Sequence, residues 1–287
     1  MGVNYSFERI LCEILKFKKG RTMIPFLDFS VTTFCTLNCR DCTQWIPYLE
    51  KRMPSAEEII GELDALFEKI DAIMFLSPLG GEPFIHPEFA RILDYLIQKQ
   101  KEGKIKYIRI VTNGTVVPSP EVIELLRARD VFVLISNYTD ILNSDQLDNR
   151  NSLIELLDMA GAKYYLVDRE FQWIDMGQPQ YRNKTSLEVD ETYRTCFIRD
   201  CVGWYGGKIY KCPRQYYVEE NCGSTPVDEC IDYKKLPKKS INAHIRKFYS
   251  LCGLQACQYC ANKEERKEVV PAIQTSKMKN WGPGHQK

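Results

Sequence analysis

Long apolar runs, a strong net charge, internal repeats and low-complexity tracts are all missing from this 287-residue sequence. No apolar run approaches the roughly 20 residues of a membrane-spanning helix, which argues against an integral membrane protein. The formal charge is only +1, so no broad nucleic-acid footprint is indicated. The N-terminal stretch "ERILCEILKFKKG" is charged throughout, unlike the apolar core of a signal peptide. We therefore expect a cytoplasmic protein with neither nucleic-acid nor membrane partners.

Cysteine is missing from residues 43–195, although the chain contains twelve. Cytosolic thiols rarely form structural disulfides, and a disulfide framework belongs to shorter and denser sequences. The cysteines instead fall into two groups separated by more than 150 residues. This distribution predicts two separate metal sites.

Residues 24–168 alternate between apolar runs typical of strands and amphipathic segments typical of helices. Ser55 and Glu58 form a capping box that predicts the start of one helix, and Ser119 with Pro120 predicts the start of another. At least five strands, each followed by a helix or loop, indicate an α/β fold with a parallel sheet. In such folds the loops after the strands carry the chemistry.

The remainder of the chain lacks this alternation. Residues 171–195 show no periodicity and are interpreted as an irregular linker or lid. The run "FIRDCVGWYGGKIYKCP" predicts a hairpin that turns at Gly206 and Gly207, and "SINAHIRKFYSLC" predicts a helix. The expected organisation is a helical segment at 1–23, a core at 24–170, the linker at 171–195, a small domain at 196–262 and a tail at 263–287.

Cys35, Cys39 and Cys42 lie in one loop directly after the first predicted strand. Iron–sulfur clusters and zinc both bind thiolates, and structural zinc normally takes four ligands. The nearest histidine in sequence is His86, and no fourth cysteine follows nearby. A four-iron cluster on these ligands would keep one iron open to a small molecule. A zinc site or an ordinary electron-carrying cluster is the alternative.

This spacing resembles the signature of the radical S-adenosylmethionine superfamily. The resemblance implies a partial (β/α)6 barrel and a [4Fe–4S] cluster whose unique iron binds the amino and carboxylate groups of S-adenosylmethionine. It further implies reductive cleavage to a 5′-deoxyadenosyl radical that abstracts hydrogen from a substrate. An electron donor such as flavodoxin or ferredoxin is expected as a partner.

Polar and glycine-rich motifs after later strands match the same superfamily. Its cosubstrate-binding residues correspond to Gly80, Gly81, Glu82, Thr112, Asn113, Ser136 and Asn137. One departure is Asp41, because the superfamily often has an aromatic residue immediately before the third cysteine. The resemblance leaves Trp45 or Tyr48 to stack on the adenine.

The second cysteine group resembles the auxiliary-cluster extension called SPASM, or its shorter form, twitch. The resemblance implies that Cys196, Cys212, Cys257 and Cys260 bind one auxiliary [4Fe–4S] cluster. A structural zinc on the same four thiolates is the alternative. Four further cysteines in this part of the chain are left without an assigned role, and any of them could replace a predicted ligand or supply a second cluster: Cys201, Cys222, Cys230 and Cys252. Cys12 is interpreted as a small buried hydrophobic residue.

The substrate class is open to three interpretations. The first is a small polar metabolite, such as a sugar, an aminocyclitol or a nucleotide-linked derivative, which would be oxidised or epimerised. The second is a peptide, although about 22 residues before the first strand are too few for a leader-binding domain. The third is a non-catalytic iron–sulfur or zinc protein. Candidate substrate contacts are Tyr138, Asp168, Arg169, Trp173 and Arg214, each of which also suits an ordinary structural role.

Overall fold

The computed structural model describes residue 18 and residues 20–167, 173–223 and 225–275. Most of the helical segment expected at residues 1–23, together with Asp168 and Arg169, lies outside these residues. Five parallel strands form the centre: β1 (Met23–Thr32), β2 (Ala72–Gly80), β3 (Ile105–Thr112), β4 (Val131–Ile135) and β5 (Tyr164–Leu166). They pair in chain order, which confirms the predicted α/β fold with a parallel sheet.

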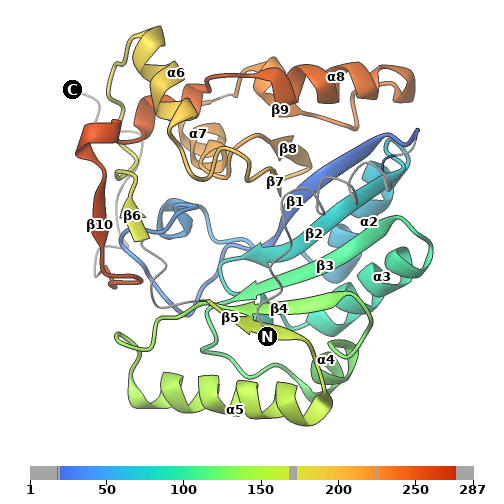
Figure 1. Ribbon diagram of the computed structural model, residues 1–287. Helices are drawn as coiled ribbons and strands as arrows, with labels where there is room; N and C mark the ends of the chain where they lie inside the picture. The colour runs from blue at the N-terminus through green and yellow to red at the C-terminus, as the bar shows by residue number, and fades with distance from the viewer. Residues whose placement is uncertain (1–17, 19, 168–172, 224, 276–287) are drawn as a thin grey trace.

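Helices cover one face of this sheet (Figure 1). They are α2 (Ala56–Phe67), α3 (Phe89–Lys101), α4 (Pro120–Leu125) and α5 (Ser144–Ala160). The capping box of Ser55 and Glu58 is present at the start of α2, and Ser119 accepts a hydrogen bond from the Val122 amide at the start of α4. The apolar faces of these helices and of the strands form the main core. The helix starts predicted from capping residues are therefore confirmed.

An aromatic ring from each parallel strand contributes to a continuous row across the sheet. Phe26 stacks on Phe75 with ring centroids 4.9 Å apart, and Phe75 stacks on Tyr107 at 4.8 Å. Phe132 and Tyr165 continue the row at 6.1 Å each. Cross-strand aromatic pairs stabilise a particular register, so this row helps to align the strand ends that carry the site.

The predicted hairpin joins the same sheet. β7 (Gly203–Tyr205) turns at Gly206 and Gly207 into β8 (Lys208–Tyr210), and β9 (Cys230–Ile231) follows as the next strand. Both turn glycines have positive φ, which the tight turn requires. β7 pairs in parallel with β1, where the Phe29 and Trp204 rings stack at 4.2 Å. The C-terminal part of the chain is thus hydrogen-bonded to the barrel strands.

The segment expected to be irregular contains regular structure. β6 (Trp173–Asp175) pairs antiparallel with β10 (Lys267–Val269), and α6 (Ser186–Arg194) begins at a capping box formed by Thr185 and Glu188. The expectation of a structureless stretch was wrong here, because a short helix and a three-residue strand leave little periodicity to read. The remaining elements are α7 (Gln215–Cys222), α8 (Lys238–Ser250) and five short 3₁₀ turns: η1 (Ile46–Tyr48), η2 (Pro83–Ile85), η3 (Val227–Glu229), η4 (Gln255–Tyr259) and η5 (Lys263–Glu265).

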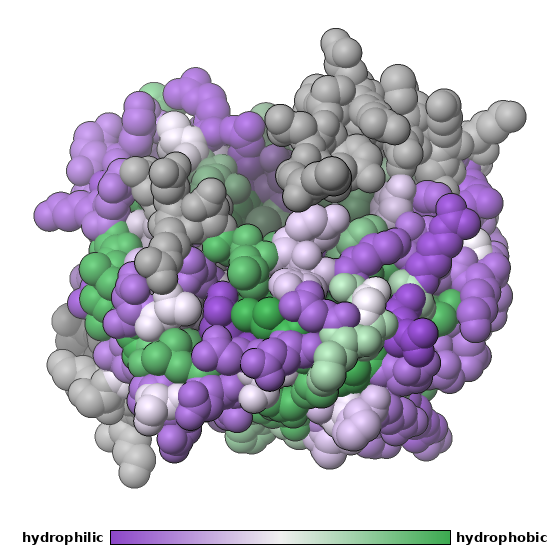
Figure 2. Space-filling model, turned by 60° about the horizontal axis from the view of Figure 1, so that its bottom comes forward, coloured by the Kyte–Doolittle hydropathy of each residue, from purple (hydrophilic) through white to green (hydrophobic). Residues whose placement is uncertain are grey.

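The surface carries both hydrophilic and apolar residues. On the face turned forward in Figure 2, hydrophilic side chains dominate the rim and apolar residues gather toward the middle. None of the helices in the described part of the chain combines the length and the apolar character needed to cross a bilayer.

Candidate active site

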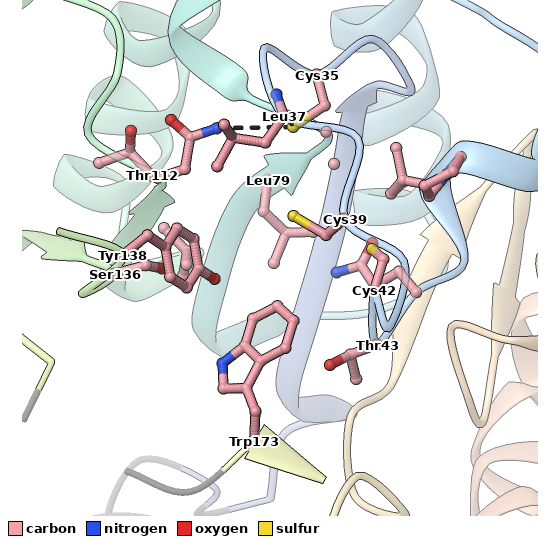
Figure 3. Close-up of a pocket in the computed structure, with 17 residues that line it drawn as sticks. Cys35, Leu37, Cys39, Cys42, Thr43, Leu79, Thr112, Ser136, Tyr138 and Trp173 are labelled. Carbon is pink, nitrogen blue, oxygen red and sulfur yellow. Dashed lines mark hydrogen bonds between the residues drawn. The ribbon is translucent and has the colours of Figure 1, made fainter. Parts of the chain in front are cut away.

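The loop after β1 brings its three cysteines to one cavity. Cys35, Cys39 and Cys42 line a cavity of about 220 Å³ at the carboxyl ends of the parallel strands, and their sulfur atoms lie around it in Figure 3. Burial, with a smaller contribution from the neighbouring thiolates, raises the pKa of the Cys35 and Cys39 thiols to about 12. These groups are therefore protonated thiols in the metal-free protein, and binding of a metal centre would be coupled to release of their protons.

Glycines after β2 let the backbone approach the cysteine loop. The Gly81 amide donates to the Thr32 carbonyl at 2.8 Å, and the next amide donates to the Phe34 carbonyl at 2.9 Å. A Cβ on Gly81 would lie 1.8 Å from the Phe34 oxygen, and one on Gly80 would lie 2.0 Å from the Thr32 oxygen. Both glycines line the cavity, and both are also required by this backbone packing.

Glu82 is fully buried, and its carboxylate is hydrogen-bonded to the protein itself. Its carboxylate accepts hydrogen bonds from the Thr112 hydroxyl at 2.8 Å, the Asn113 amide at 2.8 Å and the Phe84 amide at 3.1 Å. Burial nevertheless raises its pKa to about 7. The residue therefore holds the loops after β2 and β3 together.

The other predicted polar residues divide between the cavity and local turns. Thr112, Asn113 and Ser136 line the cavity. Asn113 also donates from Nδ2 to the Thr36 hydroxyl at 2.9 Å, within the cysteine loop. Asn137 instead accepts a hydrogen bond from the Thr139 hydroxyl at 2.9 Å. It shapes its own turn.

Two aromatic candidates form a wall of the cavity. Trp173 and Tyr138 pack edge to face with ring centroids 5.4 Å apart, and Figure 3 shows the indole directed toward the cysteines. The expectation for Trp45 and Tyr48 does not hold. Trp45 is 1% exposed and donates to the Gly177 carbonyl, while the Tyr48 hydroxyl bonds Gln178. Trp173 and Tyr138 are thus the aromatic side chains that line the cavity.

Arg214 occupies a different place from the one expected of a substrate contact. It is 2% exposed and donates from Nε to the Thr43 carbonyl at 3.0 Å and from Nη1 to the Cys260 sulfur at 3.4 Å. Thr43 follows the last cysteine of the first loop. The side chain therefore lies between the two cysteine groups.

All four predicted auxiliary cysteines line a second, much smaller cavity. Cys196 follows α6, Cys212 follows β8, and Cys257 and Cys260 lie in and after η4. Its volume is about 10 Å³. Burial and the neighbouring thiolates raise the pKa of Cys212 well above its ordinary value. Four thiols around one cavity match the donor set of a four-iron cluster, whereas no group of three or more ligand-type side chains in the described residues is arranged to hold a single metal ion.

The four cysteines without a predicted role are spread over the same part of the chain. The Cys222 thiol lies 2.9 Å from the Tyr259 hydroxyl, and the exposed Cys252 thiol donates to the Ser250 carbonyl at 3.5 Å. Cys230 lies in β9, and Cys201 is a partly buried residue before β7. None of the four lines the two cysteine cavities.

Residues near the C-terminus pack on the first cysteine loop, which sequence reasoning missed. Gln274 bridges to Cys39 in an antiparallel contact, and its Nε2 lies 3.8 Å from the Cys39 sulfur. The Arg40 amide donates to the Ile273 carbonyl at 2.8 Å, and the Thr275 amide donates to the Asn38 carbonyl at 2.8 Å. The polar stretch "AIQT" carries no local signal for this role, because the contact spans more than 230 residues of sequence.

Comparison with known proteins identifies the barrel segment. Residues 29–144 match the model of the Radical SAM superfamily. This segment is thus identified as a radical SAM domain, whose cofactors are a [4Fe–4S] cluster and S-adenosylmethionine. This confirms the resemblance and the cofactor class expected from the cysteine loop.

The matches to other proteins cover only part of this chain and only part of each of those proteins. The antilisterial bacteriocin subtilosin biosynthesis protein AlbA of Bacillus subtilis (strain 168) is 30% identical over 126 residues, 42% of this chain and 25% of AlbA. Among solved structures, Streptococcus suis SuiB bound to S-adenosylmethionine has a TM-score of 0.38 at 18% identity and covers 55% of this chain and 35% of SuiB. The structure of anSMEcpe with bound AdoMet has a TM-score of 0.40 at 16% identity, over 50% and 43%. The chain thus spans about a quarter of AlbA and about a third of SuiB.

Proposed function

We propose that this protein is a radical S-adenosylmethionine enzyme that modifies a peptide. The observation that carries the proposal is the 30% identity to AlbA, a bacteriocin biosynthesis protein, over 126 residues. Three cysteines meeting strand-end polar groups in one cavity support the enzymatic part. The interpretation as a non-catalytic carrier does not account for an aromatic and polar cavity beside the cysteines.

The peptide interpretation takes precedence over the small polar metabolite that the sequence favoured. The preference for a metabolite depended on the short segment before the first strand. That argument concerns a separate leader-binding domain and says nothing about the cavity. The match to a bacteriocin biosynthesis protein is a positive indication of substrate class, so it outweighs the length argument.

Each part of the site has a proposed role. Cys35, Cys39 and Cys42 would hold the cluster, which supplies the electron that cleaves S-adenosylmethionine. The cosubstrate would be contacted by Gly80, Gly81, Asn113 and Ser136. Glu82 would hold the loop that contains the glycines against the loop that contains Asn113. Trp173 and Tyr138 would form the wall against adenine or substrate.

The second cysteine group is proposed to bind an auxiliary four-iron cluster within residues 196–262. Cys196, Cys212, Cys257 and Cys260 supply a complete set of four thiolates around one cavity. Complete thiolate ligation leaves no iron open, so the proposed task is electron transfer. Metal binding would also stabilise this part of the fold.

The test uses anaerobically reconstituted protein with S-adenosylmethionine, a chemical reductant and short peptides encoded beside its gene. Formation of 5′-deoxyadenosine together with a mass change in one peptide is the expected result. Polar metabolites from the same gene neighbourhood serve as the comparison set. Modification of a metabolite, with every peptide unchanged, would overturn the peptide proposal while leaving the enzyme class intact.

A further inference from the structure

Arg214 has an unusual set of partners for a buried cation. Its Nη1 donates to the carbonyl oxygens of Met176 at 3.0 Å and Gly177 at 3.3 Å and to the Cys260 sulfur at 3.4 Å, while Nε donates to the Thr43 carbonyl at 3.0 Å. The guanidinium carbon lies 4.3 Å from the centre of the Trp45 ring. These contacts place one rigid, charged group between the two cysteine cavities.

The residue whose ring contacts Arg214 has a strained backbone. Trp45 adopts a left-handed backbone conformation with φ 57°, which a bulky residue rarely does. Its indole then lies under the guanidinium and donates to the Gly177 carbonyl at 3.1 Å. A strained residue of this kind persists only where the surrounding structure requires it.

The charge of Arg214 calls for an anionic neighbour. The partners described above are carbonyl dipoles, an aromatic ring and a thiol, and dipoles compensate a desolvated cation incompletely. A thiolate-ligated iron–sulfur cluster on Cys260 would carry negative charge directly at the end of this side chain. Hydrogen bonds to ligand sulfurs and nearby charge are among the factors that set cluster potentials.

We propose that Arg214 is a positioning residue that couples the two cysteine sites. Through its bond to the Cys260 sulfur it raises the reduction potential of the auxiliary cluster, because a positive donor stabilises the more negative reduced state. Through its bond to the Thr43 carbonyl it holds the end of the first cysteine loop. The inference rests on the proposed function, in which both cysteine groups bind clusters.

The geometry predicts that lysine cannot replace this arginine. The planar guanidinium directs donors from Nε and Nη1 toward opposite sides, to Thr43 and to Cys260, whereas an ammonium is a single point on a flexible stem. Arg214→Lys keeps the positive charge but loses the pair of donors that reach Thr43 and Cys260 together. Arg214→Met keeps much of the side-chain length and loses both.

The test measures the auxiliary cluster alone, in protein whose Cys35, Cys39 and Cys42 are replaced by alanine. Iron and sulfide analysis of this parent comes first, and absence of a cluster there counts against the proposed function, not against Arg214 in particular. A dithionite titration followed by electron paramagnetic resonance then gives the midpoint potential. Arg214→Met should shift it to a more negative value, and Arg214→Lys should shift it less.

A matched control separates this effect from the general loss of an arginine. Arg182 is partly buried near the same segment and pairs with Glu265 at 3.1 Å, so Arg182→Met should leave the potential unchanged. If Arg214→Met fails to retain its cluster, the lysine variant still predicts a negative shift. Midpoint potentials of the Arg214 variants equal to that of the parent would overturn the proposal and leave Arg214 a packing residue.

The proposed role of Arg214 in holding the first cysteine loop is tested separately, through binding of S-adenosylmethionine. In protein with all cysteines intact, Arg214→Met should weaken binding of S-adenosylmethionine, measured by equilibrium dialysis, because Thr43 lines the first cavity. Arg182→Met should bind it normally. Unchanged affinity in the Arg214 variant would remove the role in holding the loop.

Discussion

The carboxylate of Glu82 accepts a 2.8 Å hydrogen bond from the hydroxyl of Thr112, which joins the loop after β2 to the end of β3 beside the first cysteine cavity. Both residues belong to motifs that the sequence assigned to cosubstrate binding. In the structure the carboxylate oxygens of Glu82 accept hydrogen bonds from protein groups. The motif is therefore partly a device for holding two strand ends together.

The pH dependence of stability should report on Glu82. Burial raises the pKa of its carboxyl from 4.5 to about 7, so the folded state favours the neutral form. Its contribution to the free energy of unfolding is fully present below pH 4.5 and is lost as the pH rises through 7, by on the order of 3 kcal/mol. Urea unfolding of iron-free protein and of Glu82→Gln between pH 5 and 8 measures the difference. If the free energy of unfolding changes with pH in the same way in both proteins, the raised pKa of Glu82 is contradicted.

Replacement of Gly81 should disturb the cysteine loop as well as the cosubstrate. The added Cβ of Gly81→Ala would lie 1.8 Å from the Phe34 carbonyl oxygen, so we expect reduced iron retention and a lower melting temperature. Gly61→Ala in α2 is the matched control, because nothing lies within 4 Å of its added Cβ, and it should raise helix stability by about 0.5–1 kcal/mol. Normal iron with weakened S-adenosylmethionine binding in Gly81→Ala would instead favour a purely cosubstrate-binding role.

Removal of the three loop cysteines should separate the two metal sites. Anaerobic protein is expected to contain about eight irons per chain, and the Cys35, Cys39 and Cys42 triple alanine variant about half of that. The variant should form no 5′-deoxyadenosine. About four irons with stoichiometric zinc in the unaltered protein would identify the second site as a structural zinc.

The C-terminal contact predicts that a short truncation will damage the first site. A chain ending at Val270 loses the contacts of Ile273 and Gln274 with the cysteine loop, so the first cluster should be lost more readily during gel filtration. A chain ending at Thr275 retains these contacts and serves as the control. Equal iron content in the two truncated proteins would show that the contact is dispensable.

Trp173 should contribute to ligand affinity through its ring. Trp173→Ala is expected to weaken S-adenosylmethionine binding about tenfold, since aromatic stacking contributes about 1–1.5 kcal/mol, and Trp173→Phe should retain most of it. Equilibrium dialysis with reconstituted protein gives both affinities. If both variants bind the cosubstrate normally but modify substrate slowly, the ring contacts the substrate instead.

Strand-end residues were predictable because parallel strands deliver their carboxyl ends to one edge. Periodicity located β1, β2, β3 and β4, and residues at or just after their carboxyl ends line one cavity, among them Cys35, Gly80, Thr112 and Ser136. The hairpin at Gly206 and Gly207 was predictable for a different reason, because its backbone requires positive φ at both positions. In these cases local chemistry and three-dimensional position coincide.

Residues whose roles depend on distant parts of the chain were not predictable. Trp45 gives no sign in sequence that Arg214 will stack on it, and Gln274 gives no sign of its bridge to Cys39. Asn137 resembled a ligand-binding residue because turn-capping and ligand-binding asparagines look alike in sequence. Long-range packing decided each of these cases.

The pairing of β7 with β1 has a consequence beyond the placement of cysteines. β1 is a ten-residue strand that pairs with β2 on one side and, at Asp28 and Phe29, with β7 on the other. Without β7, the backbone groups of β1 at Asp28 and Phe29 would be unpaired at the edge of the sheet. The cysteine-rich segment thus extends the sheet beyond β1 through its own backbone, so that β9 and not β1 is the outer strand on this side.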